Sequence, residues 1–306
     1  MPATPRGWAG LSPDSAAKPD AAVAVEYRYP DFLCIGVQKA GTSWLDVNLR
    51  RHPQVWLPPM KELQFFSHVH LPATRRWTDR QRRHRGLQFL RRYMERNAPE
   101  DWNYRYIGRL ADLVAGPVTD GWYGRMFALA SPERVCGEMT PEYSLLPEAG
   151  IEHVLRLSPD VRIILSLRDP IERSWSHIRM LARQRGIEAA AELVPFANVE
   201  DHLERADYAA IVARWRRFIP KERFLVIFMD DVAERPYVVL EDICAFLGVS
   251  YQPDVFKRAE EAVHAGEARA MPPAVLAALK ENLRPAYDGI AALYPEIAAR
   301  WMARYY

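Results

Sequence analysis

The sequence predicts an α/β protein in three layers, with a central, mostly parallel β-sheet flanked by helices. Short apolar runs at residues 32–36, 161–167 and 223–228 each have the length and composition of a buried strand. The first two runs lead through a turn into a segment with helical spacing of its apolar residues. Strands that alternate with helices in this way form parallel sheets covered on both faces.

The remaining elements follow from the same patterns. We expect a helix over residues 43–51, a short strand at 55–57 and another strand at 135–138. A helix begins near Ile171, because a proline at position 170 suits the first helical turn. The C-terminal third is predicted to be helical over residues 237–247, ending at Gly248 as a C-cap, and again over residues 273–302.

One compact domain is expected over residues 30–306, because a chain of 306 residues with 49% hydrophobic residues can bury a single large core. Residues 1–29 are rich in Ala, Pro, Asp and Gly without apolar periodicity, which predicts a flexible lead-in. Residues 71–130 contain many Arg, Trp and Tyr but no strand signal. We expect this stretch to be a helical insert that forms a lid or one wall of a ligand cleft.

Charge and cysteine content exclude several classes of protein. Lys and Arg number 41 against 39 acidic residues, so the net charge of +2 gives no overall attraction to nucleic acid or to membranes. Cys34, Cys136 and Cys244 lie in apolar runs without the spacing of a zinc site, which predicts reduced core residues. We find neither a signal-peptide pattern nor an apolar run of about 18 residues, and therefore expect no membrane span and a cytoplasmic location.

The first candidate site is the run GVQKAGTS at residues 36–43, where a strand turns into a helix. Backbone N–H groups and the positive end of the helix point to one place in such a turn, which favours an anion. The spacing imitates the nucleotide-binding motif G-x-x-x-x-G-K-[ST], but Thr42 stands where that motif needs lysine, and Lys39 lies upstream. The alternative is an ordinary turn in which Thr42 or Ser43 caps the helix.

The second candidate site is the run LRDPIERSWSH at residues 167–177. Arg168 ends a strand at the edge where open α/β sheets bind ligands, and Ser176 lies about two helical turns further on. Together they are suited to hold one phosphate. The alternative pairs Arg168 with Asp169 or Glu172 and leaves Ser176 in solvent. Two anion sites at one sheet edge fit a nucleotide phosphorylated at two distant positions.

These runs carry a family resemblance. Residues 38–45 resemble the 5'-phosphosulfate-binding loop of sulfotransferases that use 3'-phosphoadenosine 5'-phosphosulfate (PAPS), and residues 168–176 resemble their 3'-phosphate-binding segment. The resemblance extends more loosely from about residue 32 to 301, and it implies a P-loop-like fold with PAPS as co-substrate. The implied donor-binding residues are Lys39, Ala40, Gly41, Thr42, Ser43 and Trp44 at the 5' end, Arg168 and Ser176 at the 3'-phosphate, and Arg269 of the run GEARAMP as a further 3'-phosphate ligand.

Sulfuryl transfer needs a base for the acceptor proton and a cation for the departing phosphate oxygen. Lys39 suits the second task. The run KELQFF at residues 61–66 resembles the segment of glycosaminoglycan-type sulfotransferases that holds their glutamate base, which makes Glu62 the candidate. Cytosolic small-molecule sulfotransferases use a histidine, so His68 and His70 are alternatives. The structural alternative for Glu62 is a surface ion pair with Lys61 or an arginine.

The run GEMTPEY at residues 137–143 departs from the heparan-sulfate 3-O-type pattern, because those relatives carry a lysine where Met139 stands. This departure argues against an acidic glycan as acceptor. Glu138 either lines the active centre or is a buried partner of an arginine. No metal is expected, because a sulfuryl group bears one negative charge that a lysine and hydroxyl donors can balance.

The sequence therefore predicts a sulfotransferase that acts on a hydroxyl or amine of a small-molecule, lipid or carbohydrate acceptor. The alternatives are a P-loop-like nucleotide kinase, a catalytically inactive PAPS-binding protein, and a nucleic-acid-binding module. The last rests on seven arginines in one helical stretch, which we interpret as a solvated helix face, so no nucleic-acid partner is expected. They are Arg80, Arg82, Arg83, Arg85, Arg91, Arg92 and Arg96.

Overall fold

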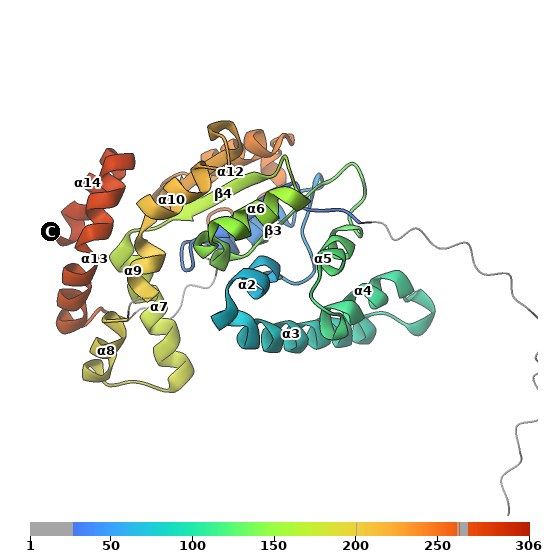
Figure 1. Ribbon diagram of the computed structural model, residues 1–306, viewed down its shortest axis with the longest axis horizontal. Coiled ribbons are helices and arrows are strands. Elements are labelled where there is room, and N and C mark those ends of the chain that lie inside the picture. Colours follow the sequence, from blue (N-terminus) through green and yellow to red (C-terminus); the bar gives the residue numbers. More distant parts are fainter. Residues whose placement is uncertain (1–26, 200, 262, 264–268) are drawn as a thin grey trace, which may run out of the picture.

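The computed structural model describes residues 27–199, 201–261, 263 and 269–306. Most of the expected lead-in at residues 1–29 lies outside the described residues, and so do residues 266–268 of the GEARAMP run. The described chain folds as a β-sheet with helices on both faces (Figure 1).

The sheet consists of β1 (Phe32–Gly36), β2 (Val55–Trp56), β3 (Val135–Met139), β4 (Arg162–Leu167) and β5 (Phe224–Phe228). Every pairing in it is parallel, in the order β2-β3-β1-β4-β5. The predicted α/β fold is confirmed, with a sheet that is wholly parallel rather than mostly so. β1 lies between β3 and β4, so the strand order reverses at β1, where such sheets bind ligands.

The two faces of the sheet are covered by different helices. Successive side chains of β1 alternate between two core clusters, with Leu33 in one and Cys34 in the other. The Cys34 face packs against α1 (Thr42–Leu49) and α12 (Pro236–Leu247). The Leu33 face packs against a larger group: α2 (Phe65–His70), α5 (Asp120–Phe127), α6 (Glu148–Leu157), α7 (Pro170–Arg185) and α10 (Tyr208–Arg216), with the C-terminal helices.

Residues 71–130 hold α3 (Arg75–Arg96), α4 (Tyr104–Ala115) and α5, and no strand occurs in this described range. α3 and α4 pack against each other and run along the lower part of Figure 1, away from the strands. Gly86 permits their close approach, because a Cβ on Gly86 would lie 2.9 Å from Cγ2 of Val114. The insert thus forms a helical hairpin beside the sheet.

The helix expected over residues 273–302 is instead two helices, α13 (Pro273–Leu293) and α14 (Pro295–Tyr305). Pro295 disfavours helical geometry at the residue before it, and Tyr294 has φ −139° and ψ 71°. The remaining described helices and 3-10 turns are short: α8 (Val194–Ala197), α9 (Asp201–Ala206), α11 (Met229–Glu234), and turns at Pro72–Thr74, Pro99–Asp101, Pro141–Leu145, Ala190–Leu193, Lys221–Arg223 and Pro253–Val255.

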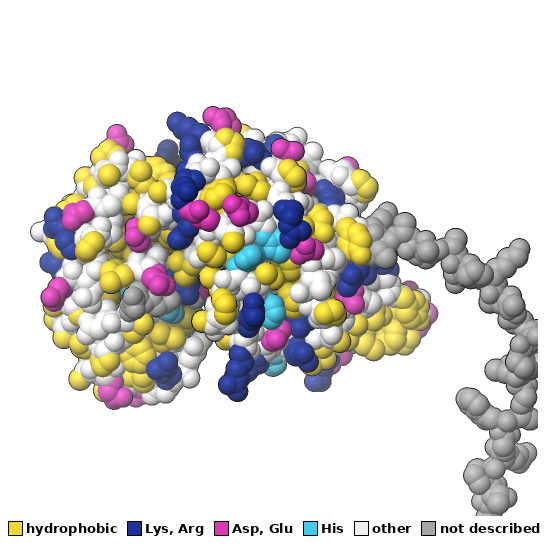
Figure 2. Space-filling model, viewed as in Figure 1, with side chains coloured by type: hydrophobic (Ala, Val, Ile, Leu, Met, Phe, Trp, Pro, Cys, Tyr) yellow, Lys and Arg dark blue, Asp and Glu magenta, His cyan; other side chains and the backbone are white. Residues whose placement is uncertain are grey.

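The cysteines lie in the core, and the surface charges are mixed, as expected from the sequence. Cys34, Cys136 and Cys244 are free and buried, and burial raises the pKa of Cys34 and Cys244 to about 11 and that of Cys136 to about 12. On the face shown in Figure 2, basic and acidic side chains are interspersed. The search of the described residues finds no helix with the length and apolar character needed to cross a bilayer.

We expect Gly137→Ala to destabilise the fold. Gly137 pairs with Phe32 across β3 and β1, and a Cβ on Gly137 would lie 2.4 Å from the Phe32 ring. Relieving this clash requires one strand to move, which is expected to lower the free energy of unfolding by about 1–3 kcal/mol. Urea denaturation measures the change.

Gly108→Ala is the matched control. Gly108 is an exposed residue within α4, and a Cβ there would meet no atom within 4 Å. The alanine should leave the free energy of unfolding unchanged or raise it by up to about 1 kcal/mol. Equal stability of Gly137→Ala and the unmodified protein would contradict the packing of β3 on β1.

Candidate functional site

A cavity of about 1820 Å³ lies at the carboxyl ends of β1 and β4. The loop after β1, residues 61–62, α3, α7 and residues 229–236 contribute to its walls. Of the residues predicted from the sequence, nine line this cavity: Lys39, Gly41, Thr42, Ser43, Trp44, Glu62, Arg168, Ser176 and Arg269. The two runs singled out in the sequence therefore meet at one site.

The loop after β1 is anchored to the neighbouring strand. The Val37 N–H donates to the carbonyl of Ser166 on β4 at 2.8 Å, and the Ser166 hydroxyl donates to the carbonyl of Ala40. Gly41 has φ 81°, and a Cβ there would lie 2.1 Å from Sδ of Met229. α1 begins directly afterwards at Thr42, and the first N–H groups of a helix lack an intrahelical partner. Amides in this position are suited to bind an anion.

Two of the predicted donor-binding residues have their side chains in the core. Ala40 is fully buried and does not line the cavity, and its N–H donates to the carbonyl of Val37 at 3.2 Å. The expectation that Ala40 binds the donor therefore does not fit this geometry. Trp44 is 5% exposed, and its Nε1 donates to the carbonyl of Ala259 at 2.7 Å. Trp44 lines the cavity, but its Nε1 is already engaged in this hydrogen bond.

Lys39 reaches into the cavity from a backbone in the left-handed region, with φ 71°. Its Nζ lies 3.9 Å from Sδ of Met180 on α7. Burial lowers the pKa of Lys39, and the positive charges of neighbouring basic residues, Arg168 first, lower this pKa further. A cluster of cations that repel one another is stabilised by an anion between them. The site therefore fits a ligand with several negative charges.

Arg168 occupies the turn between β4 and α7. The Tyr208 hydroxyl donates to its carbonyl at 2.6 Å, and its Nη2 donates to Oε2 of Glu172 at 3.0 Å. The pairing with Glu172 that the sequence left open is thus present, and Arg168 nevertheless lines the cavity. Ser176 lies one helical turn beyond Glu172 and lines the cavity as well. A phosphate in this corner would share Arg168 with Glu172.

Arg269 lines the same cavity although it lies far away in the sequence. Its Nη2 donates to the carbonyl of Glu188, and its own carbonyl accepts from Nε1 of Trp175 at 3.2 Å. Trp175 directly precedes Ser176. The bond from Trp175 holds the backbone of Arg269 close to α7.

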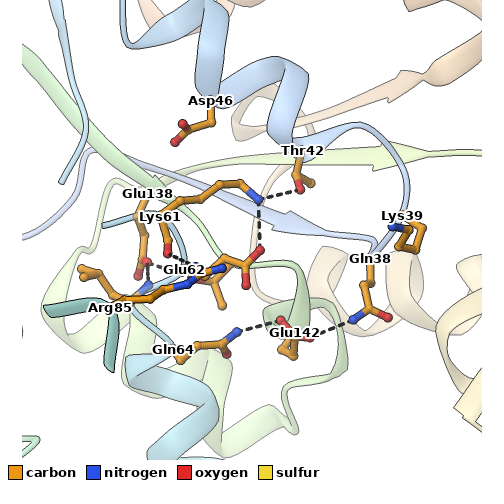
Figure 3. Close-up of polar contacts among 12 residues, drawn as sticks. Gln38, Lys39, Thr42, Asp46, Lys61, Glu62, Gln64, Arg85, Glu138 and Glu142 are labelled. Carbon is orange, nitrogen blue, oxygen red and sulfur yellow. Dashed lines mark hydrogen bonds and ion pairs between the residues drawn. The ribbon is translucent and has the colours of Figure 1, made fainter. Parts of the chain in front are cut away.

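Glu62 lies in the loop that connects β2 to α2, and its backbone is in the left-handed region, with φ 64°. Its Oε1 is 3.0 Å from Nζ of Lys61, and the same Nζ donates to Oγ1 of Thr42 at 3.2 Å (Figure 3). The ion pair with Lys61 is therefore present, but its side chains are 18% and 21% exposed and line the cavity. Lys61, interpreted from the sequence as a surface partner, connects the candidate base to the start of α1.

Glu138 fixes the backbone beside Glu62. It is 2% exposed and does not line the cavity. One of its oxygens accepts from the Leu63 N–H at 3.1 Å, and the other accepts from the hydroxyls of Tyr123 and Tyr143 at 2.7 and 2.8 Å. Among the described residues, Glu138 is neither part of the cavity wall nor hydrogen-bonded to an arginine, so its contacts differ from both expectations. Burial raises the pKa of Glu138, and the tyrosine hydrogen bonds oppose this rise in its pKa.

Two arginines of α3 are bound within the protein rather than solvated. Arg85 donates to the carbonyl of Lys61 at 3.1 Å, and Arg82 is buried and donates to the carbonyl of Leu113 at 2.7 Å. The other arginines of the basic stretch are exposed: Arg80, Arg83, Arg91, Arg92 and Arg96. The predicted solvated face holds for these five, while Arg85 holds the backbone that leads to Glu62.

Glu142 was not singled out by sequence reasoning. It is 5% exposed, lines the cavity and accepts from Nε2 of Gln64 at 2.9 Å and from Nε2 of Gln38 at 3.5 Å (Figure 3). Burial raises the pKa of Glu142, and the charge of Glu62 raises this pKa further. The only feature of the sequence that could have pointed to Glu142 is its place in the GEMTPEY run at residues 137–143.

The histidines considered as alternative bases are not part of the cavity wall. His68 Nδ1 lies 3.1 Å from Oγ1 of Thr78, and His70 Nε2 lies 2.8 Å from Nδ1 of His153. Neither is placed to take a proton from a molecule bound beside Lys39.

In the described part of the chain, no three His, Cys, Asp or Glu side chains are grouped to hold a metal ion.

Comparison with known proteins places this geometry in a family. A model of the sulfotransferase family matches residues 30–253. Human heparan sulfate glucosamine 3-O-sulfotransferase 6 is 24% identical over 229 residues, which are 72% of this chain and 53% of that protein. The membrane-associated sulfotransferase kil1 of Dictyostelium discoideum is 24% identical over 165 residues, 53% of this chain and 26% of that protein. The chain thus spans about a quarter to a half of these relatives.

Solved structures share the fold. The sulfotransferase from Alicyclobacillus acidocaldarius superposes with a TM-score of 0.57 at 24% identity, over 87% of this chain and 96% of that chain. The sulfotransferase domain of the Synechococcus PCC 7002 olefin synthase gives a TM-score of 0.50 at 16% identity, over 84% and 95%. Because the family model spans more than half of the residues and both loops of the cavity lie within its match, the chain belongs to the sulfotransferase family.

Proposed function

We propose that this protein transfers a sulfuryl group from PAPS to a hydroxyl or amine of an acceptor, with Glu62 as general base and Lys39 stabilising the departing phosphate. The observation that carries the proposal is that the loops after β1 and β4 line the same cavity. Membership of the family gives the reaction class and implies PAPS, which supplies the transferable group. The finer assignments below concern this chain's own residues.

The donor site has two ends. Lys39 and the first amides of α1, at Thr42 and Ser43, would hold the 5'-phosphosulfate. Arg168, Ser176 and Arg269 would hold the 3'-phosphate. Burial lowers the pKa of Lys39, and the positive charges of Arg168 and its neighbours lower this pKa further, which supports an anionic ligand beside Lys39.

The reacting end is built around Glu62. Its carboxylate accepts the proton of the attacking hydroxyl, and the attack is directed at the sulfuryl group held by the first loop. Lys61 touches both Glu62 and Thr42, so its ammonium is placed to meet the sulfuryl oxygens. Lys39 meets the negative charge that develops on the phosphate oxygen as the bond to sulfur breaks.

The competing functions are distinguished by turnover. A nucleotide kinase would need a lysine where Thr42 stands. A protein that binds PAPS without catalysis would share the donor site but form no product.

We also propose that the protein works in a reducing compartment such as the cytoplasm, because its three cysteines are buried and unpaired.

The first test concerns the 3'-phosphate. The protein is expected to bind 3'-phosphoadenosine 5'-phosphate (PAP) about 10- to 100-fold more tightly than AMP, because Arg168 and Ser176 contact a group that AMP lacks. Isothermal titration calorimetry measures both affinities, and Arg168→Ala should reduce the difference. Equal affinity for PAP and AMP would exclude the proposed donor site.

A second test concerns metal ions. Chelation of divalent cations with EDTA is expected to leave sulfuryl transfer intact, because Lys39 and the loop amides balance the charge of the donor. PAP formation with and without EDTA is the measurement. A strict requirement for Mg²⁺ would favour the kinase alternative.

A third test separates the two catalytic residues. Glu62→Gln preserves the shape of the side chain but cannot accept a proton, so kcat should fall by about 10²–10⁴-fold while PAP affinity is retained. Lys39→Ala should weaken both, with the larger effect on kcat, because the charge it meets grows in the transition state. Steady-state kinetics and calorimetry give the two quantities. Near-normal turnover of Glu62→Gln would show that another group is the base.

A further inference from the structure

The C-terminal helices α13 and α14 contact two acidic side chains at the start of α7. The two helices pack against each other at the left of Figure 1, and α13 also packs against α7. The Tyr287 hydroxyl on α13 donates to Oδ1 of Asp169 at 2.8 Å, and the Tyr305 hydroxyl on α14 donates to Oε1 of Glu172. Both helices lie beyond residue 253, where the match to the family model ends. The family match therefore assigns these contacts no role.

The backbone of Arg168 is fixed from two directions. Its carbonyl accepts from the Tyr208 hydroxyl at 2.6 Å. The next residue, Asp169, caps α7 by accepting from two N–H groups of the first turn at 2.9 and 3.1 Å, and Tyr287 donates to the same carboxylate oxygen. What remains to be set is the direction of the Arg168 side chain, and a planar guanidinium binds phosphate best when its fork faces the oxygens.

Glu172 sets the direction of the Arg168 side chain. Its Oε2 accepts from Nη2 of Arg168 at 3.0 Å, and its Oε1 accepts from the Tyr305 hydroxyl. The Arg168 and Glu172 side chains are 28% and 33% exposed, and both line the cavity. An ion pair in contact with solvent leaves long side chains free to move. Because Tyr305 holds the second oxygen, the Glu172 carboxylate stays in place and meets the guanidinium with one oxygen only.

The Tyr305 hydroxyl is suited to hold this carboxylate. Burial raises the pKa of Tyr305, and the hydrogen bond to Glu172 raises this pKa further, so the hydroxyl keeps its proton and remains a donor. Without the hydroxyl, Oε1 of Glu172 would lose its donor, and both carboxylate oxygens could turn to Arg168 as a bidentate pair. Such a pair would occupy the N–H groups that a phosphate needs.

We propose that Tyr305 is a positioning residue for the donor, which acts through Glu172 to keep the Arg168 guanidinium available to the 3'-phosphate of PAPS. Tyr305 is not part of the cavity wall, so its action on the ligand is indirect. The assignment rests on the proposed donor site, in which Arg168 holds the 3'-phosphate. It makes the selectivity of that site for a 3'-phosphorylated nucleotide depend on α14.

Tyr305→Phe tests this role, because it removes the hydroxyl and retains the ring. Its affinity for PAP should fall by about 3- to 10-fold, while its affinity for AMP, which has no 3'-phosphate, should not change. In turnover, KM for PAPS should rise by a similar factor while kcat at saturating PAPS is retained. Isothermal titration calorimetry and steady-state kinetics give these quantities. Unchanged PAP affinity, or an equal loss of affinity for PAP and AMP, would overturn the proposal.

Tyr306→Phe is the matched control. Tyr306 is the neighbouring tyrosine, it is 44% exposed, and its hydroxyl donates to the carbonyl of Lys280 at 2.6 Å. The control should leave the affinities for PAP and AMP unchanged, because Tyr306 has no hydrogen bond to Glu172. A loss of PAP affinity in Tyr306→Phe equal to that in Tyr305→Phe would show that the contact with Glu172 is not the cause.

A double-mutant cycle tests the route through Glu172. In a Glu172→Ala background Tyr305 has no carboxylate to hold, so Tyr305→Phe should change PAP affinity by less than about 2-fold. The same loss of PAP affinity with and without Glu172 would show that Tyr305 acts by another route, and would overturn the proposal.

The proposed donor site and the role of Tyr305 fail in different ways. If the unmodified protein binds PAP and AMP equally, the donor site is wrong, and the role of Tyr305 falls with it. If the unmodified protein prefers PAP and Tyr305→Phe prefers it to the same degree, the donor site stands and Tyr305 is not a positioning residue.

Discussion

The parallel pairing of β1 with β4 is the constraint on which the site depends. It brings the loop at residues 37–41 beside Arg168, and the hydrogen bond from Val37 to Ser166 continues the pairing past the end of β1. Without this pairing, Lys39 and Arg168 would belong to separate turns with little affinity for anything. With it, burial lowers the pKa of Lys39 and the nearby charge of Arg168 lowers this pKa further. Mutual repulsion between these cations thus favours a ligand with two anionic ends.

Glu62 depends on a different kind of constraint. Lys39, Glu62 and Gln64 are the non-glycine residues with positive φ in the described chain, and such a conformation is unfavourable by about 1–2 kcal/mol for an L-residue. It persists where neighbouring contacts leave no alternative. Glu138, buried beneath this segment, holds the Leu63 N–H and is itself fixed by two tyrosines. The rigid polar core beneath the segment therefore sets the direction of the carboxylate above it.

The parts of this site that the sequence predicts are those determined by residues close together in the chain. Strands and the two loops were predictable because a local apolar run, a glycine and a proline determine them. The roles of Glu138 and Lys61 were not, because their partners Tyr123 and Thr42 are distant in the sequence and only the folded chain brings them together. The division of the last predicted helix was signalled by Pro295, but the apolar spacing continues across it and hides the break.

α3 has two adjacent faces with different contacts. Thr78, Arg82 and Gly86 form its buried face, which packs towards α4 and α5, while Trp77 and Gln81 belong to the face that lines the cavity. Because the two faces are separate, the cavity face can change without loss of the anchoring contacts. The exception is Arg85, whose bond to the Lys61 carbonyl joins the insert to the backbone that carries Glu62.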